Sequence, residues 1–437
     1  MSASPRAVCE WEQPGATPGG LSVVLPRVGD MYATVAVSGY RSLRDVVLPL
    51  GNLTVITGAN GSGKSSVYRA LRLLGACGRG EVVRALAQEG GLESALWAGP
   101  ESLAQARRGH EVQGTMRSGP IAIRLGVGGV EGELSYLTDL GIPVQAEGTR
   151  FNRDPEIKRE AVWHGPVMRP STLVARRKHS RVEVRENGGW EQAPARLPPW
   201  SSMLTELVDP LGMPEPWAVR EALRTWRFYD GFRVDAQAPA RRPQVGTRTW
   251  ALAEDGADVA AALQTIREDD GSPLAAAVAD AFDGATLDVV ATDGLFDIAL
   301  HQPGMLRPLR SAELSDGTLR YLLWLAALLT PVPPRLLALN EPETSLHPSL
   351  VPPLARAIAT ASRRTQVVVV THAQPLVDAL ADAVREQRDL DEDPRDLEPE
   401  PGELLPLRLH ELTKDLGETL AAGQGLLTTP SWEWGRR

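Results

Sequence analysis

The hydrophobic pattern of the first eighty residues predicts strands that lead into one long helix. Residues 33–39 and 45–50 have the apolar content and the flanking turn residues of two strands. Residues 53–58 (LTVITG) form a continuous apolar run, which is typical of a strand buried on both faces. Helical spacing begins at Lys64 and continues to about Leu74. We therefore expect two short strands, a buried strand and a helix, in this order.

The middle of the chain has a weaker pattern. Residues 120–127 and 132–140 predict a hairpin, whereas residues 146–243 look irregular and are rich in Arg, Trp and Pro. Helical spacing returns clearly at 255–268, and strands are expected within 287–301. No sustained heptad pattern is present, so we expect no long coiled coil.

The final third alternates between helices and strands. Helices are predicted at 317–329, 348–362 and 375–387, and apolar strands at 335–341 and 365–372. This alternation implies a parallel sheet with crossover helices. The longest apolar stretch lies inside the first of these helices and is too short to cross a membrane.

Composition excludes some classes of protein. The chain has 437 residues and a formal net charge of −9, which argues against a wholly basic nucleic-acid coat protein but not against a local basic groove. Cys9 and Cys77 are the only cysteines and belong to no CxxC pattern, so a disulfide framework is not expected. The first twenty residues lack the apolar core of a signal peptide. We expect a cytoplasmic protein with no membrane span.

Two segments near the C-terminus differ in charge and pattern. Residues 388–403 are acidic and contain prolines, which is typical of a solvated loop, and residues 406–420 are expected to return to the edge of the sheet. The expected division of the chain is 1–30 as a flexible leader, 31–80 as the first half of a core, 81–300 as an inserted lobe with helices and strands, and 301–437 as the second half of the core and a tail.

The residues after the buried strand have the chemistry of a phosphate-binding loop. Gly58, Gly63, Lys64 and Ser65 match the pattern G-x-x-x-x-G-K-[ST] between a strand and a helix. The glycines let backbone N–H groups point inward, and the helix N-terminus adds partial positive charge. The lysine then reaches the β- and γ-phosphates, and the serine hydroxyl reaches magnesium. This pattern predicts nucleotide binding.

Three later elements narrow the class of NTPase. The stretch LSDGT (314–318) precedes an apolar helix and, taken alone, is only a helix cap with a turn. A predicted strand ends in Asn340 and Glu341, where parallel sheets place their ligands. The next strand ends in His372. The three elements are far more specific together, in this order behind a P-loop, than any of them is alone.

These motifs resemble those of the ATP-binding-cassette ATPases of the SMC/RecF class. The chain is most similar to predicted bacterial AAA-family ATPases related to the overcoming-lysogenization-defect proteins, over residues 32–78 and 312–380. The resemblance implies an α/β P-loop NTPase of ABC type. Its mixed sheet would carry an N-terminal antiparallel β-subdomain and an inserted α/β lobe, without a long coiled coil. Fewer than seventy residues follow His372 in this sequence, so we expect no added nuclease domain.

The resemblance also assigns roles to residues. It makes Glu341 the general base, His372 the switch histidine that senses the γ-phosphate, and Lys64 the third catalytic residue. ATP and Mg²⁺ are the implied cofactors, with Ser65 and Asn340 at the magnesium. The alternatives for a Q-loop glutamine are Gln88 and Gln113. The implied nucleotide-binding residues are Arg41, Ser42, Gly58, Ala59, Asn60, Gly61, Ser62, Gly63, Lys64, Ser65, Ser66, Ser315 and Gly317.

In this class the signature residues Ser315 and Gly317 contact ATP bound to the opposite subunit, which implies an ATP-dependent homodimer. Asn340 departs from the pattern, because relatives have an aspartate that holds magnesium at this position. An amide keeps an oxygen acceptor but loses the charge, so the metal site is expected to be weaker. Because Glu341 is retained, we expect slow but real hydrolysis; the alternative is a nucleotide-gated switch with little turnover.

The partner of this ATPase is predicted from the arginines of the middle region. They could follow a phosphate backbone while neighbouring aromatics stack on bases, or they could pair with carboxylates while the aromatics form core. We weigh a DNA-associated ATPase for repair or phage defence, a regulator of an effector protein, and, more weakly, the ATPase subunit of a transporter. The residues concerned are Arg169, Arg176, Arg177, Lys178, Arg181, Arg185, Arg224, Trp226, Arg227, Phe228, Tyr229, Arg233, Arg241, Arg242, Arg248 and Trp250.

Overall fold

The structure is a computed structural model of the whole chain. It describes residues 31–103, 106–109, 121–144, 147–148, 150–151, 153–186, 188–193, 196–391, 404–424 and 429–435. The expected leader at 1–30 and the Q-loop alternative Gln113 lie outside the described residues. Of the acidic segment 388–403, the first four residues belong to a helix and residues 392–403 lie outside the described residues.

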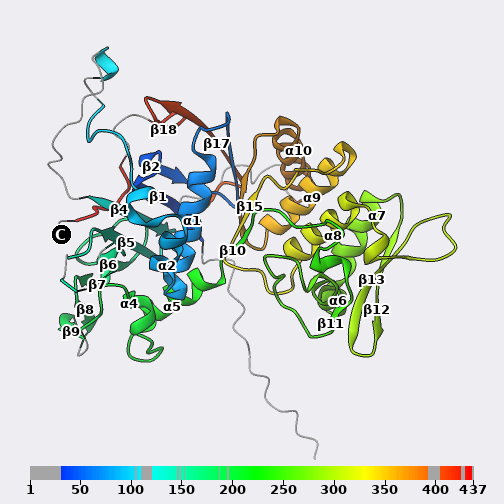
Figure 1. Cartoon of the computed structure of the whole chain (residues 1–437), viewed down its shortest axis with the longest axis horizontal. Helices are drawn as coiled ribbons and strands as arrows, with labels where there is room; N and C mark the ends of the chain where they lie inside the picture. Colours follow the sequence, from blue (N-terminus) through cyan, green and yellow to red (C-terminus); the bar gives the residue numbers. More distant parts are fainter. Residues whose placement is uncertain are drawn as a thin grey trace, which may run out of the picture.

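An antiparallel sheet of eight strands occupies one half of the molecule (Figure 1). Its strand order is β2-β1-β4-β5-β6-β7-β8-β9, and the expected hairpin of 120–140 forms its β4–β5 pair. The bounds are β1 (Tyr32–Tyr40), β2 (Leu43–Pro49), β4 (Ala122–Gly129), β5 (Leu134–Gly141), β6 (Glu156–His164), β7 (Leu173–Lys178), β8 (Arg181–Glu186) and β9 (Gly189–Gln192).

A second sheet of six strands forms the centre of the molecule. Its order is β10-β15-β16-β3-β17-β18, with the first five strands parallel and β18 antiparallel at the edge. The tail was expected at the edge of this sheet; β17 lies inside it beside β3, and only β18 is an edge strand. The bounds are β3 (Leu53–Gly58), β10 (Arg227–Tyr229), β15 (Leu336–Asn340), β16 (Gln366–Val370), β17 (Leu407–Asp415) and β18 (Glu418–Ala421).

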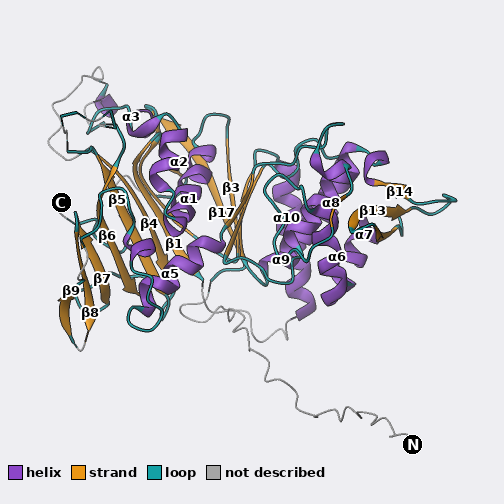
Figure 2. Cartoon of the chain, turned by 60° about the horizontal axis from the view of Figure 1, so that its bottom comes forward, coloured by secondary structure: helices purple, strands orange, loops and turns teal. Residues whose placement is uncertain are grey.

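Helices cover both faces of this parallel sheet (Figure 2). Helix α1 lies between the two large sheets, and α6, α8, α9 and α10 pack on the opposite face. The helices are α1 (Lys64–Arg79), α2 (Val82–Gln88), α3 (Gly91–Ala95), α4 (Met203–Glu206), α5 (Pro214–Thr225), α6 (Val259–Asp270), α7 (Ser272–Ala281), α8 (Asp316–Leu328), α9 (Val351–Ser362) and α10 (Gln374–Asp391).

Side chains of the parallel strands alternate between two cores. In β15, Leu336 and Ala338 belong to the core around α1, whereas Leu337 and Leu339 belong to the core around α8. The strand is apolar at every position because both faces of the sheet are covered. A small third sheet packs against α6 and α7 and consists of β11 (Gln244–Val245), β12 (Thr286–Thr292), β13 (Leu295–His301) and β14 (Leu309–Arg310).

The expected fold class is confirmed: the chain is a mixed α/β P-loop fold with an antiparallel subdomain. Within the described ranges the longest helix is α10, with 18 residues, so no long coiled-coil arm is present there. None of the helices in these ranges combines the length and the hydropathy needed to cross a membrane.

One expectation for the middle of the chain is wrong. Residues 146–243 are not irregular as a whole, because they contain β6 to β9, which extend the antiparallel sheet. The strands of residues 81–300, which were expected as an inserted lobe with helices and strands, are distributed over all three sheets, and β10 joins the parallel one. Bulges in β5–β6 and β6–β7 pairing interrupt the two-residue period that would have revealed the strands.

Candidate active site

The parallel register brings three predicted motifs to one edge of the central sheet. The P-loop strand β3 pairs with β16, and β16 pairs with β15, so that Ile56, Val370 and Asn340 lie side by side. Carboxyl ends of parallel strands share an edge, which is where such sheets bind ligands. The P-loop is therefore a neighbour of Glu341 and His372, although hundreds of residues separate it from them in the chain.

The P-loop has the backbone shape that phosphate binding needs. Gly58, Gly61 and Gly63 all have positive φ angles, of 144°, 79° and 110°. Gly63 is the N-cap residue of α1 and offers no side-chain cap, and the first turn of α1 contains no acidic residue. The N–H groups at the start of this 16-residue helix thus face no competing carboxylate of the same turn.

Lys64 and Ser62 give a further test of whether a phosphate group fits. Lys64 is only 6% exposed, and its ammonium donates to the Gly58 and Ala59 carbonyls at 2.6 and 3.0 Å. The Ser62 hydroxyl is buried and has no hydrogen-bond partner in the described residues. A buried cation and an unpaired buried hydroxyl inside a glycine loop fit an anionic group with several acceptor oxygens.

The C-terminal hairpin β17–β18 packs directly on the P-loop, which sequence reasoning missed. Thr419 Oγ1 lies 2.8 Å from both the Ser62 carbonyl and the Ser42 hydroxyl, and the Thr419 N–H donates to the Ser42 carbonyl. A Cβ atom on Gly63 would lie 2.1 Å from Thr419 Oγ1, and one on Gly58 would lie 2.3 Å from the Leu412 carbonyl. The glycines are therefore required by this hairpin as well as by their φ angles.

Arg41 and Ser42 lie in the turn between β1 and β2. Ser42 reaches the P-loop only through Thr419, whereas the Arg41 guanidinium contacts the Glu89 carboxylate at 2.8 Å. Tyr40 donates to the same carboxylate at 2.5 Å. Glu89 lines the pocket that also contains Ser65, so Arg41 is anchored at the rim of that pocket.

Glu341 and His372 face each other at the ends of β15 and β16. His372 Nδ1 lies 3.1 Å from Glu341 Oε1, and both side chains are partly exposed. Glu341 has a φ of 47°, and its N–H donates to the Val370 carbonyl at 2.7 Å. A left-handed backbone costs a non-glycine residue about 1–3 kcal/mol, and residues held this way cluster at functional sites. The carboxylate is thus held by a strained but well-bonded turn.

Glu343 is a second carboxylate of this turn, to which the sequence assigned no role. Thr371 donates to its Oε1, while its Oε2 is buried without a partner among the described residues. Burial raises the pKa of the Glu343 carboxyl, the Thr371 hydrogen bond lowers it, and the nearby Glu341 charge raises it. Glu343 joins the loop after β15 to the loop after β16.

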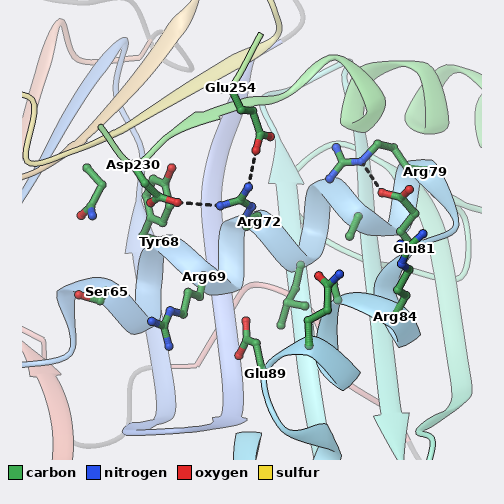
Figure 3. Close-up of a pocket in the computed structure, with 15 residues that line it drawn as sticks. Ser65, Tyr68, Arg69, Arg72, Arg79, Glu81, Arg84, Glu89, Asp230 and Glu254 are labelled. Atoms are coloured by element: carbon green, nitrogen blue, oxygen red, sulfur yellow. Dashed lines mark hydrogen bonds and ion pairs between the residues drawn. The ribbon is translucent and has the colours of Figure 1, made fainter. Parts of the chain in front are cut away.

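Asn340 and Ser65 line one pocket of about 810 Å³ (Figure 3). Gln88 lines the same pocket, so of the two Q-loop alternatives it is the one that the described residues place near the P-loop. Asn340 also lines a second pocket of about 290 Å³ together with Glu341. The Asn340 amide thus stands between the proposed magnesium residue and the proposed base.

A carboxylate lies beside Asn340 on the neighbouring strand. Asp230 follows β10, whose Tyr229 pairs with Leu339 of β15, and Asp230 lines both pockets that Asn340 lines. Its Oδ2 accepts a hydrogen bond from Arg72 of α1 at 2.7 Å, and Arg72 also pairs with Glu254 (Figure 3). Sequence reasoning missed Asp230 because β10 has only three residues.

The signature residues lie on the other side of the sheet. Ser315 caps α8 by accepting from the Thr318 N–H at 3.1 Å, and space around Gly317 is open. Neither residue hydrogen-bonds to the P-loop of the same chain within the described ranges. Arg241, expected at a nucleic acid, instead donates to the Leu314 carbonyl at 2.7 Å and pairs with Asp316.

Most of the aromatic residues that accompany the arginines at 224–250 belong to the hydrophobic core. Trp226, Phe228 and Tyr229 are each 1% exposed, because they pack under α1 and α8. Only Trp250 is exposed, with the Arg248 guanidinium 5.5 Å from its ring. Of the two alternatives for the aromatics at 224–250, the core alternative is therefore confirmed for Trp226, Phe228 and Tyr229. Of the cations at 169–185, Arg177 is also buried, and Arg169 lies in the loop between β6 and β7. The others belong to β7 and β8 of the antiparallel sheet: Arg176, Lys178, Arg181 and Arg185.

Two family models match the chain. One described as "AAA domain" matches residues 34–78, which contain the P-loop. One described as "AAA domain, putative AbiEii toxin, Type IV TA system" matches residues 196–379, which contain the signature, Glu341 and His372. Both models describe AAA domains, and β4 to β9 lie between the two matched segments. The resemblance to AAA-family ATPases is confirmed at this level, and no curated protein matches the chain.

Three of the solved structures with a similar course of the chain are heads of SMC proteins. An SmcHead bound to the C-winged helix domain of ScpA has a TM-score of 0.47 at 13% identity, over 91% of this chain and 98% of that one. The SMC head domain from Thermotoga maritima has a TM-score of 0.43 at 15% identity, over 91% of this chain and 100% of that one. A third structure is an Smc head with an extended coiled coil, bound to the C-terminal domain of ScpA derived from Pyrococcus furiosus. Its TM-score is 0.43 at 12% identity, over 90% of this chain and 96% of that one. At these identities residue roles do not transfer.

Proposed function

We propose that this chain binds ATP with Mg²⁺ and hydrolyses it at the carboxyl edge of the parallel sheet. The observation that carries the proposal is the 3.1 Å contact between His372 and Glu341, one strand away from the P-loop. A P-loop supplies a phosphate cradle, and a carboxylate at the neighbouring strand end can orient and deprotonate water. No other clustering in the described residues combines these parts.

Each residue of the site has a separate proposed role in ATP binding or hydrolysis. When bound, ATP with Mg²⁺ supplies a γ-phosphate open to attack and a cation that neutralises phosphate charge. The P-loop amides from Gly58 to Ser66 and the Lys64 ammonium hold the phosphates, and the Ser65 hydroxyl faces the metal. Glu341 takes a proton from water, and His372 fixes the orientation of that carboxylate.

Asn340 weakens the metal site without removing it. Its amide oxygen is a neutral acceptor, and Asp230, which follows the neighbouring strand β10, lines the same two pockets. Carboxylates can hold Mg²⁺ through water. A carboxylate at the end of β10 can therefore replace one at the end of β15 in supporting the metal. We infer that Asp230 supplies the negative charge that relatives place at position 340, with Arg72 holding the carboxylate in position.

Ser315 and Gly317 are proposed to act on the ATP of a second copy. They cap a 13-residue helix whose first turn is exposed, and they lie across the sheet from α1 of their own chain. A second chain, turned head to tail, could present this turn to the P-loop. The resulting homodimer would contain two composite sites, and nucleic acid or an effector protein would bind the dimer.

A second candidate function is a nucleotide-gated switch that binds ATP and turns over little. The observation that favours it is Asn340, since a neutral residue replaces the usual metal-associated charge. The two functions differ in one quantity, the turnover of bound ATP, whereas both require ATP binding.

The test is steady-state ATP hydrolysis by the purified chain with Mg²⁺, with and without DNA. Glu341→Gln is expected to lower turnover by about 10²–10⁴-fold and to keep ATP binding, because only the base is lost. Glu386→Gln, an exposed change on α10, is the matched control and should leave turnover unchanged. Equal turnover in wild type and Glu341→Gln would overturn the proposed role of Glu341.

A further inference from the structure

One face of the eight-stranded sheet is not covered by helices of the described chain. Helices α1 and α5 pack on the face that carries Ile123, Leu125, Val127 and the other residues of the core around α1. Residues 429–435 lie against the opposite face. There the Trp432 ring fits over Gly126 and Gly128 of β4, where a Cβ atom would lie 2.7 and 2.9 Å from it. The rest of this open face borders a groove.

The strand register lines up cations across this open face. Arg124 of β4 pairs with Asp139 of β5, which pairs with Arg159 of β6; Arg159 pairs with Lys178 of β7, which pairs with Arg181 of β8. Directly paired residues of antiparallel strands point to the same face. Neighbouring strands are about 4.8 Å apart, so the row extends over roughly 19 Å.

Further cations surround this row. Arg169, Arg176 and Arg185 line a groove of about 1160 Å³ together with Arg124 and Arg159. A second hollow of about 640 Å³ shares Arg159 and Arg176 with it and continues past Lys178 and Arg181. The two hollows therefore form one basic surface on a chain whose net charge is −9.

The positive charge of this surface is only partly compensated. Asp139 is buried and lies 3.6 Å from Arg124, and Glu183 pairs with Arg176 at 2.5 Å. Arg169, Lys178 and Arg181 are exposed and form no ion pair with a described residue. The acidic residues that line the larger groove are Asp45 and Glu433.

The pKa of Arg159 is lowered in part by neighbouring positive charges. Burial lowers the pKa of its guanidinium; Asp139 opposes this, and the charges of Arg124 and Arg176 lower the pKa further. The Arg159 side chain also donates to the Trp434 carbonyl. An anion placed over Arg124, Arg159 and Arg176 would therefore relieve repulsion that Asp139, Glu183 and Glu433 neutralise only in part.

Tryptophans accompany the cations. Trp190 of β9 pairs with Arg185 across the strands, and the Arg176 guanidinium lies 4.2 Å from the centre of its ring. Trp190 and Trp434 are both partly exposed and line the larger groove. Sheet faces that combine basic rows with partly exposed aromatic rings suit single strands, because the backbone meets the cations and unpaired bases stack on the rings.

We propose that the open face of the antiparallel sheet, over β4 to β9, binds a single-stranded nucleic acid. This rests on the proposed function in one respect, since it names the nucleic acid on which the ATPase acts. The phosphodiesters lie along the row from Arg124 to Arg181, and bases stack near Trp190 and Trp434. A duplex would present phosphates but no free base faces, and an acidic peptide would use the cations without the tryptophans.

The test is binding of the full chain to fluorescein-labelled 20-mers, measured by anisotropy at several salt concentrations. The probes are oligo(dT), oligo(rU), a 20-base-pair DNA duplex and polyglutamate. The test variant is the triple change Arg169→Glu, Lys178→Glu and Arg181→Glu. Its matched control, with the same change of net charge, is Arg248→Glu, Arg364→Glu and Arg385→Glu, all exposed and away from the sheet face. Circular dichroism and basal ATP turnover verify folding.

The triple variant is expected to bind oligo(dT) roughly tenfold or more weakly at low salt. Because each lost phosphate contact removes about 0.7 from the slope of log K against log salt for single strands, the slope should fall by about 2. Trp190→Ala, which keeps every charge, should weaken binding by about tenfold and leave the slope unchanged. The control triple should behave as wild type. The ratio of oligo(dT) to oligo(rU) affinity decides between DNA and RNA.

Three results would overturn the site: equal binding by both triple variants, tighter binding of the duplex than of the single strands, or polyglutamate binding that competes fully with oligo(dT). The outcome is separable from that of the ATPase. Absence of turnover in a wild type that still binds oligo(dT) contradicts the proposed function and leaves the site standing. Normal turnover with unchanged binding in the triple variant contradicts the site alone.

Discussion

The carboxyl edge of the parallel sheet and the open face of the antiparallel sheet encode their chemistry differently. At the edge, the P-loop and the ends of β15 and β16 are short local motifs, and the fold only has to place strand ends together. On the open face no motif exists: Arg124, Arg159, Lys178 and Arg181 become one row only through strand register. Local motifs can be found in a sequence, whereas a row created by register requires the structure.

The largest expected effect comes from two neighbouring arginines on opposite faces of β7. Arg177 is buried, contacts Glu160 at 3.1 Å and donates to the His179 and Pro198 carbonyls. Arg177→Ala leaves the Glu160 charge buried and unpaired, and is expected to lower the free energy of unfolding by about 3–5 kcal/mol. Arg176→Ala, on the open face, should cost about 1 kcal/mol or less. Urea denaturation measures both.

This pair of variants tests whether Arg176 lies on the open face of the sheet and Arg177 on the buried face. If Arg176→Ala destabilises the protein as much as Arg177→Ala, the two side chains share one environment. The open face would then be covered, and the proposed binding surface would not exist.

The next effect concerns the charge beside Asn340. Asp230→Asn removes the carboxylate next to the proposed metal position, and losses of metal-supporting residues typically cost about 10–100-fold in metal affinity or activity. We expect the Mg²⁺ concentration for half-maximal turnover to rise by roughly tenfold, with ATP binding retained. Glu254→Gln, which removes the other partner of Arg72, is the matched control. An equal rise in both variants would show that only the position of Arg72 matters.

A smaller effect is predicted for the hairpin on the P-loop. Thr419→Val removes the hydroxyl 2.8 Å from the Ser62 carbonyl and keeps the shape of the side chain. One lost hydrogen bond is worth about 1 kcal/mol, so the KM for ATP should rise about fivefold. Thr419→Ser keeps the hydroxyl and should restore the wild-type KM. If both variants match wild type, the hairpin does not shape the P-loop.

The smallest effect is a pH dependence at Glu343. Because the pKa of this carboxyl is raised in the folded protein, the folded state holds its proton more tightly than the unfolded state does. Its contribution to stability is therefore present at low pH and is lost as pH rises from the unfolded pKa through the folded pKa. Glu343→Gln should raise the Tm at pH 7 by about 1–2 °C and leave it unchanged near pH 4. A lower Tm at pH 7 would contradict this.

The candidate site was predictable to the extent that it consists of local motifs. Lys64, Glu341 and His372 stand after apolar strands, and the strand-helix alternation of the final third already predicted a shared edge. Thr419 could not be found, because its contact with Ser62 joins residues 357 positions apart. Asp230 was missed because β10 is short and because its aromatic residues were considered as a possible surface for stacking on bases.

The antiparallel sheet was harder to predict for a physical reason. In its strands, arginines occur both on the open face and on the face that packs against the core. The sequence therefore does not show that Arg176 is exposed and that Arg177 is buried. Burial separates them: Arg177 is 1% exposed. Bulges near Asp139 and Trp163 shift the register by one residue, which reverses the face of every residue beyond them.

The most direct test of the account is a single turnover of bound ATP. Enzyme in excess is mixed with radiolabelled ATP and Mg²⁺, and the labelled ADP is counted over time. Wild type is expected to convert the bound ATP completely, whereas Glu341→Gln binds it and leaves it intact. If wild type also leaves its bound ATP intact, the edge of the parallel sheet is a nucleotide switch and not a hydrolytic site.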